Sequence, residues 1–174
     1  MEGPYTSERC AAFAAHWFGL RQDGLIPTLA AFLDKPVPEF QPMVSIVEVV
    51  SDDDIRYRLV GTDLVESFGH ERTGNNFLEA SPPSFRANLV RWSRTVKNHP
   101  CGARSLGLLS SSKGRDLKFE TVGFPLLRKS GTPLIVGYSE PLSRLDSDEV
   151  MVTFKDARDV IWIDIGYGVP DAHA

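Results

Sequence analysis

Two acidic residues stand where a small enzyme would need a general base. Asp63 and Glu66 lie beside the apolar residues of a short segment with helical spacing, and a carboxylate buried next to a pocket can remove a proton from a substrate. A second interpretation is that both carboxylates are solvated near the first turn of this helix, where negative charge is favourable. The first interpretation gives one candidate function, a small enzyme on a cone-shaped α+β scaffold that uses a buried carboxylate as a general base.

Other chemistry-bearing motifs are missing from the sequence. It contains no P-loop, no dinucleotide-binding glycine fingerprint and no GxSxG elbow. The run Asp52-Asp53-Asp54 lacks the longer oxygen-ligand pattern of a calcium loop, which favours a solvated hairpin turn. The histidines show neither HxxH nor HExxH spacing; they are His16, His70, His99 and His173. The sequence therefore predicts no metal site and no catalytic residue.

The composition limits the classes of function. The chain has 174 residues and a net charge of −4, with acidic and basic residues interleaved, so it lacks the basic footprint of a nucleic-acid-binding protein. No apolar run approaches the roughly 20 residues that span a bilayer, and residues 1–4 do not begin a signal peptide. Cys10 and Cys101 form neither a disulfide framework nor a CxxC pair. We expect a cytoplasmic protein with free thiols that binds neither nucleic acid nor membrane.

The chain is organised around residues 55–78. Ile55, Tyr57 and Leu59 alternate with arginines, which indicates a half-buried strand. Gly61 ends this alternation, a short helix follows, and Gly69 closes the helix. After a loop, residues 77 and 78 turn back toward the core. A strand that leads through glycine into a short helix and a loop predicts a concave layer, which can hold a small ligand or a plug of side chains.

The motifs of this stretch resemble those of a PAS domain, and the resemblance covers roughly residues 12–140. The closest similarity is to a family of bacterial stand-alone PAS-like proteins. The residues that carry it are Tyr57-Arg58-Leu59-Val60-Gly61-Thr62, Phe68-Gly69, Thr73-Gly74 and Phe77-Leu78, preceded by His16-Trp17-Phe18, Leu20-Arg21, Gly24, Ile26-Pro27 and Pro36. The resemblance implies a non-enzymatic sensory or protein-interaction module in bacterial signal transduction. It also implies an α+β fold with a PAS-like five-stranded antiparallel sheet and helices on one face, plus an N-terminal helix and a C-terminal extra strand.

The order of the expected elements agrees with the PAS order. Strands are expected at residues 43–50 and 55–60, joined by the acidic turn, and the clearest helix covers residues 84–98 with Ser84 as its cap. Further strands are expected at residues 104–111, 116–127 and 134–138, with a bulge near Val122-Gly123, and a final strand at 160–165 either adds to a sheet edge or pairs with another subunit. We divide the chain into an N-terminal helix and connector (1–42), a PAS-like core (43–142) and a linker, strand and tail (143–174).

The concave layer yields a candidate pocket for a small apolar or aromatic molecule. The phenol of Tyr57 and the indole N–H of Trp92 are its polar groups. The alternative is a packed apolar core without a ligand, because aromatic residues at core spacing usually form core. The pocket candidates are Tyr57, Leu59, Leu64, Phe68, Phe77, Phe85, Leu89, Trp92 and Phe124.

No cofactor is expected in this pocket. In PAS domains of the light-sensing type, flavin photochemistry depends on a cysteine in the loop after the short helix, and here residues 74–78 contain none. A haem would require an axial ligand, and only His70 and His99 lie near the expected pocket. We therefore expect a colourless protein.

The N-terminal helix, expected at residues 7–22, carries an apolar stripe of Phe13, Trp17 and Leu20. This stripe can pack on the domain's own sheet or form a helix-mediated homodimer, since an amphipathic pattern shows burial without naming the partner. Large exposed apolar patches usually mark association sites, so these three residues are candidates for a dimer interface. We also expect a protein partner that receives the signal.

Overall fold

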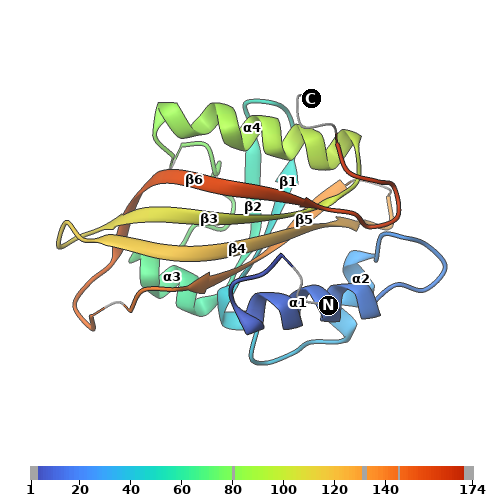
Figure 1. Cartoon of the computed structure of the whole chain (residues 1–174), viewed down its shortest axis with the longest axis horizontal. Helices are drawn as coiled ribbons and strands as arrows, with labels where there is room; N and C mark the ends of the chain where they lie inside the picture. Colours follow the sequence, from blue (N-terminus) through green and yellow to red (C-terminus); the bar gives the residue numbers. More distant parts are fainter. Residues whose placement is uncertain (1–3, 80, 131–132, 145, 171–174) are drawn as a thin grey trace.

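The computed structural model describes residues 4–79, 81–130, 133–144 and 146–170. They form one six-stranded sheet in the order β2-β1-β5-β4-β3-β6, with every neighbouring pair antiparallel. The sheet lies between helices on both sides (Figure 1). The elements are α1 (Glu8–Gly19), α2 (Leu29–Asp34), a 3-10 turn η1 (Gln41–Met43), β1 (Val44–Val49), β2 (Ile55–Val60), α3 (Thr62–Phe68), α4 (Pro83–Asn98), β3 (Gly102–Ser111), β4 (Asp116–Leu127), β5 (Pro133–Pro141) and β6 (Met151–Ile163).

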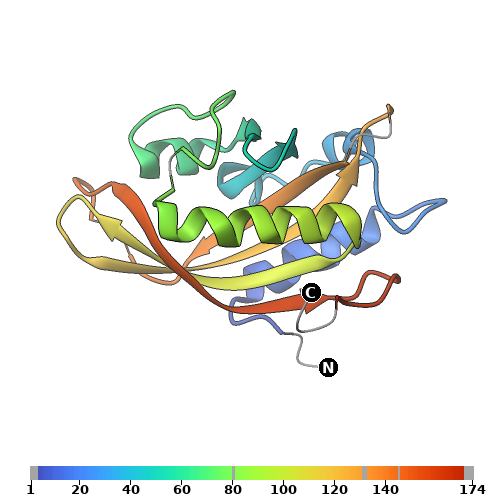
Figure 2. The same ribbon diagram turned by 90° about the horizontal axis from the view of Figure 1, so that it is seen from above.

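The first five strands have the expected PAS arrangement. β1 and β2 form the predicted hairpin over the acidic turn, and β3, β4 and β5 form a meander. β1 pairs with β5, which joins hairpin and meander into one sheet. The α+β fold predicted from the sequence is confirmed, with the N-terminal helix lying on the face opposite α4 (Figure 2).

Helix α4 starts one residue before the predicted position. Its N-cap residue is Pro82, and Pro83 occupies the first helical position, where a fixed φ and a missing N–H cost nothing. The prediction that Ser84 is the cap is therefore wrong; the side chain of Ser84 lies outside the described part of the structure. The helix ends at Asn98 as predicted.

The predicted bulge in β4 is also wrong. The pairing of β4 with β3 and with β5 runs without a register shift through Val122 and Gly123. Phe119, Thr121 and Gly123 face one side of the sheet, and Val122 faces the other. The apparent change of phase arises because helices cover both faces, so that apolar residues occur on consecutive positions.

Strand β6 is more than twice as long as predicted. It runs antiparallel to β3 with three register shifts, from Gly102↔Ile163 to Ser111↔Met151. Of the two interpretations left open by the sequence, addition to the sheet edge is the one that the structure shows. β6 covers the free ladder of β3 and itself becomes the outer edge.

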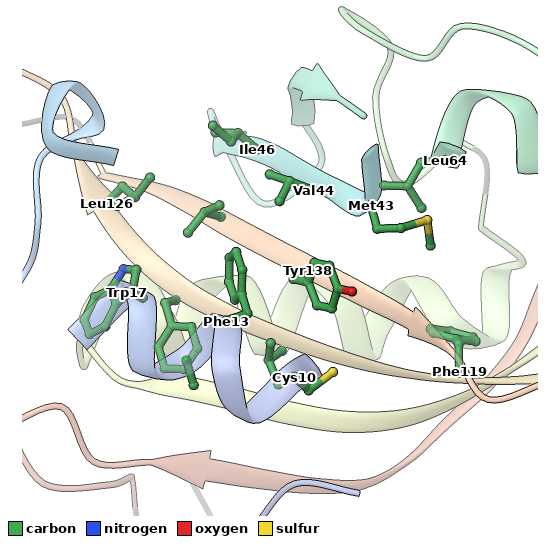
Figure 3. Packing of buried hydrophobic residues seen from close by; sticks show 14 of the residues in the cluster. Cys10, Phe13, Trp17, Met43, Val44, Ile46, Leu64, Phe119, Leu126 and Tyr138 are labelled. Atoms are coloured by element: carbon green, nitrogen blue, oxygen red, sulfur yellow. The ribbon is translucent and has the colours of Figure 1, made fainter. Parts of the chain in front are cut away.

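The apolar stripe of α1 packs on the domain's own sheet. Phe13 and Trp17 are fully buried and Leu20 is almost so. Figure 3 shows the α1 side chains directed at the sheet, where Phe13 stacks on Tyr138 with ring centroids 5.2 Å apart. Trp17 stacks on Phe124 at 4.8 Å, and its Nε1 donates a hydrogen bond of 3.0 Å to the carbonyl of Pro125. The expectation that this stripe is exposed for a second subunit is wrong, because the sheet already occupies it.

A buried ion pair fixes the start of α1 to the sheet. Glu120 on β4 is fully buried and accepts hydrogen bonds from the backbone N–H groups of Thr6 (2.8 Å) and Ser7 (2.6 Å) and from Nε of Arg104 (2.6 Å). Burial alone would raise the pKa of Glu120, but the hydrogen bonds from Thr6, Arg104 and Ser7 outweigh it and hold this pKa below its ordinary value. Every oxygen of this carboxylate is therefore used to hold the N-terminal segment.

We predict that Trp17→Glu unfolds the protein rather than separating subunits. The substitution removes a buried indole and places a carboxylate among Phe13, Phe18 and Phe124, and loss of the indole alone costs about 3–5 kcal/mol. Chemical denaturation measures the effect. Ala15→Glu, on the exposed side of the same helix, is the matched control. A folded, monomeric Trp17→Glu variant beside a dimeric wild type would contradict the packing described here.

Glu120→Gln should destabilise by about 3–5 kcal/mol, because it leaves the buried guanidinium of Arg104 without its counter-charge. The folded-state pKa of Glu120 is depressed, so its contribution is complete above the ordinary value of 4.5 and is lost as the pH falls through the lower, folded pKa. Wild type should therefore lose more stability in acid than the variant. Asp116→Asn, on the same strand but in an exposed pair with Lys155, should change little; an equal effect of both substitutions would contradict the anchoring role.

Candidate functional site

A small cavity lies between the sheet and the helices α3 and α4. Its volume is about 110 Å³. The lining residues come from η1, α3, the loop between α3 and α4, α4 and all six strands, and most are apolar; they are Met43, Ser45, Val47, Tyr57, Leu64, Phe68, Phe77, Trp92, Leu109, Phe119, Thr121, Gly123, Ile135, Gly137, Ser139, Pro141 and Met151.

The floor of the cavity is a pair of glycines. Gly123 on β4 and Gly137 on β5 are direct cross-strand partners, so the sheet carries no side chain at this point. A Cβ atom at Gly123 would come within 2.8 Å of the Trp92 ring, whereas one at Gly137 would meet only the hydroxyl of Ser45 at 3.4 Å and the Val122 carbonyl at 3.7 Å. The indole therefore lies on Gly123, and the open space is above Gly137.

Five of the nine predicted pocket residues line this cavity. Four of the five come from the stretch that organises the chain, and Trp92 comes from α4. The five are Tyr57, Leu64, Phe68, Phe77 and Trp92.

Leu59 lies on the opposite face of the sheet. In the pairing of β1 with β2, Ile46 is opposite Leu59 while the next residue, Val47, is opposite Tyr57. Consecutive residues of β1 point to opposite faces and cross-strand partners share a face, so Leu59 and Tyr57 must point apart. The extra residue, Arg58, is a bulge that the alternation of β2 did not reveal. Leu59 instead lines a cleft of about 410 Å³ beneath the proline-containing connector.

Phe124 also faces away from the cavity, since it follows Gly123 on β4 and stacks on Trp17. Phe85 and Leu89 line a neighbouring cleft of about 170 Å³ between α4 and β6. That cleft shares Phe77, Trp92, Phe119 and Thr121 with the cavity, which makes these four side chains the wall between the two spaces.

Four of the lining side chains carry hydroxyl groups, in addition to the indole N–H of Trp92. Thr121 and Ser139 are hydrogen-bonded to each other at 3.0 Å across β4 and β5, and Ser45 and Tyr57 complete the set. Burial raises the pKa of Tyr57, so its phenol is protonated at neutral pH. Among the described residues that line the cavity none is charged. The serines, the threonine and the glycine pair are not among the residues predicted from the sequence, although the alignment of Gly123 with Gly137 is a signal once the strand register is known.

The chemistry-bearing residues of the sequence do not converge on this cavity. Asp63 and Glu66 are exposed on α3, so the buried carboxylate required by the enzyme hypothesis is not found at either position. His70 and His99 are not among the lining residues. In the described part of the chain no group of three metal-ligating side chains is found.

Both cysteines are buried free thiols. Burial raises the pKa of Cys101 to about 11. Burial, followed by the charge of Glu120, raises the pKa of Cys10 further. Since the thiolate is the reactive form, these thiols are inert at neutral pH.

A family model described as PAS domain matches residues 5–139. The chain belongs to the PAS domain family. The solved structure of a fungal LOV domain photoreceptor is similar with a TM-score of 0.48 and 14% identity, over 76% of this chain and 91% of that chain. No curated protein matches.

PAS domains form a family of sensory and interaction modules and are generally not enzymes. The family match includes α1 and ends before β6, so the edge strand is an addition to the matched region. None of the described helices has the length and apolar character needed to cross a membrane.

We predict that Trp92→Ala destabilises this PAS domain by about 3 kcal/mol, toward the lower end of the range for a large aromatic because the indole is only partly buried. The substitution removes the side chain that covers Gly123 and opens the cavity to the cleft beside α4. A thermal melt measures the loss. Lys97→Ala, on the exposed side of the same helix, is the control, and equal melting of Trp92→Ala and wild type would contradict the placement of α4.

Proposed function

We propose that this PAS domain is a non-enzymatic sensory module that binds a small apolar or aromatic molecule in the cavity above Gly137. The observation that carries the proposal is an internal space, lined by aromatic rings and hydroxyls, at the centre of the sheet. Such a lining suits a compact apolar body with one or two hydrogen-bonding groups.

The volume limits the size of the ligand. An apolar cavity of roughly 150 Å³ holds benzene, and the space here is about 110 Å³. The body of the ligand is therefore no larger than one aromatic ring, unless Trp92 moves and joins the cavity to the cleft beside α4. Drug-sized ligands need roughly 300–1,000 Å³, so a large cofactor would require a rearranged core.

The non-enzymatic role is supported by the chemistry of the lining. Its hydroxyls can position a ligand, but general acid–base catalysis needs a group that titrates near the working pH. Tyr57 has a raised pKa and Asp63 and Glu66 are exposed outside the cavity. No observation favours the enzyme alternative.

The output of the sensor is proposed to pass through protein contacts in a bacterial cytoplasm, by homodimerisation or by docking on a signalling partner. Because the stripe of α1 is occupied by the sheet, a dimer needs another surface. The edge strand β6 supports this role, since Val152, Val160 and Ile161 are 40–53% exposed along it and an unpaired strand edge can accept another chain.

Gly137→Ala tests the cavity directly. Its methyl group points into the open space without a clash, so we expect weaker binding of toluene by about tenfold and a gain of about 0.4–1 kcal/mol from the reduced entropy of the unfolded chain. Methyl NMR gives both the site and the affinity: the signals of Val47, Leu64 and Ile135 should move.

Gly24→Ala is the matched control, because Gly24 is exposed and a Cβ there meets nothing within 4 Å. It should leave toluene binding unchanged. Toluene that does not perturb the cavity methyl groups of wild type, or that binds Gly137→Ala as tightly as wild type, would refute the proposed ligand site.

A further inference from the structure

One buried arginine lies beside the cavity. Arg72, in the loop after α3, is only 8% exposed. Its guanidinium carbon lies 4.2 Å from the ring centroid of Phe68, a cavity-lining residue. Its Nε atom is buried and has no hydrogen-bond partner. A buried charge in this state is costly unless something neutralises it.

No carboxylate of the described chain forms an ion pair with Arg72. The adjacent acid, Glu71, uses one oxygen to accept hydrogen bonds from the backbone N–H groups of Arg72 (2.8 Å) and Thr73 (2.7 Å). The hydrogen bonds from Thr73 and Arg72 lower the pKa of Glu71, so this carboxylate remains ionised and directed at the backbone. The cation of Arg72 therefore lacks a counter-charge within the described protein.

The loop that contains Arg72 is also hydrogen-bonded to Tyr57 on β2, another residue that lines the cavity. The N–H of Gly74 donates to the carbonyl of Tyr57 at 2.8 Å, and the N–H of Tyr57 donates to the carbonyl of Asn75 at 3.1 Å. Burial raises the pKa of Tyr57, and the positive charge of Arg72 opposes part of this rise. Arg72 is not itself a lining residue, but its guanidinium packs on Phe68 and its charge acts on Tyr57, and both of these side chains line the cavity.

We propose that the ligand of this cavity is a small monocarboxylate, whose apolar end fills the space above Gly137 and whose carboxylate pairs with Arg72. This inference rests on the proposed function and adds the charge of the ligand. The guanidinium fork matches a carboxylate in shape and hydrogen-bond pattern. The hydroxyl of Tyr57, which lines the cavity, can donate a further hydrogen bond to the carboxylate.

The cavity volume sets the class of acid. A single aromatic ring or a chain of a few carbons fills about 110 Å³, so benzoate and butyrate are suitable probes, and dicarboxylates would bury a second, unpaired charge. Toluene and benzamide are the uncharged counterparts of benzoate. The charged ligand also supplies the partner that Nε of Arg72 lacks.

The test compares benzoate with toluene on the full chain. Calorimetry and methyl NMR should show that benzoate binds wild type, and that Arg72→Gln weakens benzoate by about 10- to 100-fold, as expected for loss of a charge-assisted hydrogen bond. Toluene should bind wild type and Arg72→Gln alike, which shows that the variant is folded and its cavity intact.

Arg21→Gln is the matched control. Arg21 also stacks on aromatic rings, 4.4 Å from Phe18 and 4.9 Å from Trp17, and its Nε is likewise without a partner. It lies against α1, on the other face of the sheet, so its loss should leave the benzoate affinity unchanged. A second readout needs no variant: the Nε–H signal of Arg72 should shift with benzoate and not with toluene.

The outcomes distinguish a failure of the pairing with Arg72 from a failure of the proposed ligand site. Benzoate binding that is equally weakened by Arg72→Gln and Arg21→Gln, or that leaves the Nε–H signal of Arg72 unmoved, overturns the pairing with Arg72. Toluene binding without benzoate binding overturns this inference and leaves the proposed function standing. Failure of both probes to bind wild type overturns both.

Discussion

The arrangement of this domain depends on one cross-strand pair, Gly123 opposite Gly137, at the centre of the sheet. Strands β4 and β5 are covered on both faces, so each residue along them must fill space under α1 or under α4. On the α1 face, Phe124 and Tyr138 supply large rings. On the α4 face, Gly123 and Gly137 have no side chains. Trp92 can therefore approach the backbone at Gly123, and the cavity remains open above Gly137.

The two faces of the sheet therefore perform different tasks. On the α1 face, aromatic rings stack between α1 and the sheet, and the carboxylate of Glu120 accepts hydrogen bonds from Thr6 and Ser7 of the N-terminal segment and from Arg104 of β3. The α4 face contains the space, the hydroxyl groups and the uncompensated charge of Arg72. The cavity is lined by residues of α3 and α4, so a ligand bound there as proposed would contact both helices.

Strand β6 connects these features to the outside of the molecule. It contributes Met151 to the cavity and Val160 and Trp162 to the cleft beside α4, and it also forms the exposed edge of the sheet. Occupancy of the cavity and the conformation of this edge therefore share a strand. A sensor that lacks catalytic groups in its cavity needs a physical link of this kind between ligand and partner.

The sequence by itself determined the order of the elements, since alternation, helical spacing, glycines and prolines are local signals. It placed the hairpin, α3 with its closing Gly69, and five of the nine pocket residues. The tertiary structure alone decided on which face each side chain lies. The bulge at Arg58 turns Leu59 away from Tyr57. Phe124 packs against α1 because helices cover both faces of the sheet. Each of these placements depends on residues that are distant in the chain. The spacing of the apolar stripe of α1 predicted that the stripe is buried, but only the folded structure shows that the domain's own sheet buries it. In the same way, the position of Arg72 beside Phe68, without a carboxylate as partner, follows only from the folded structure.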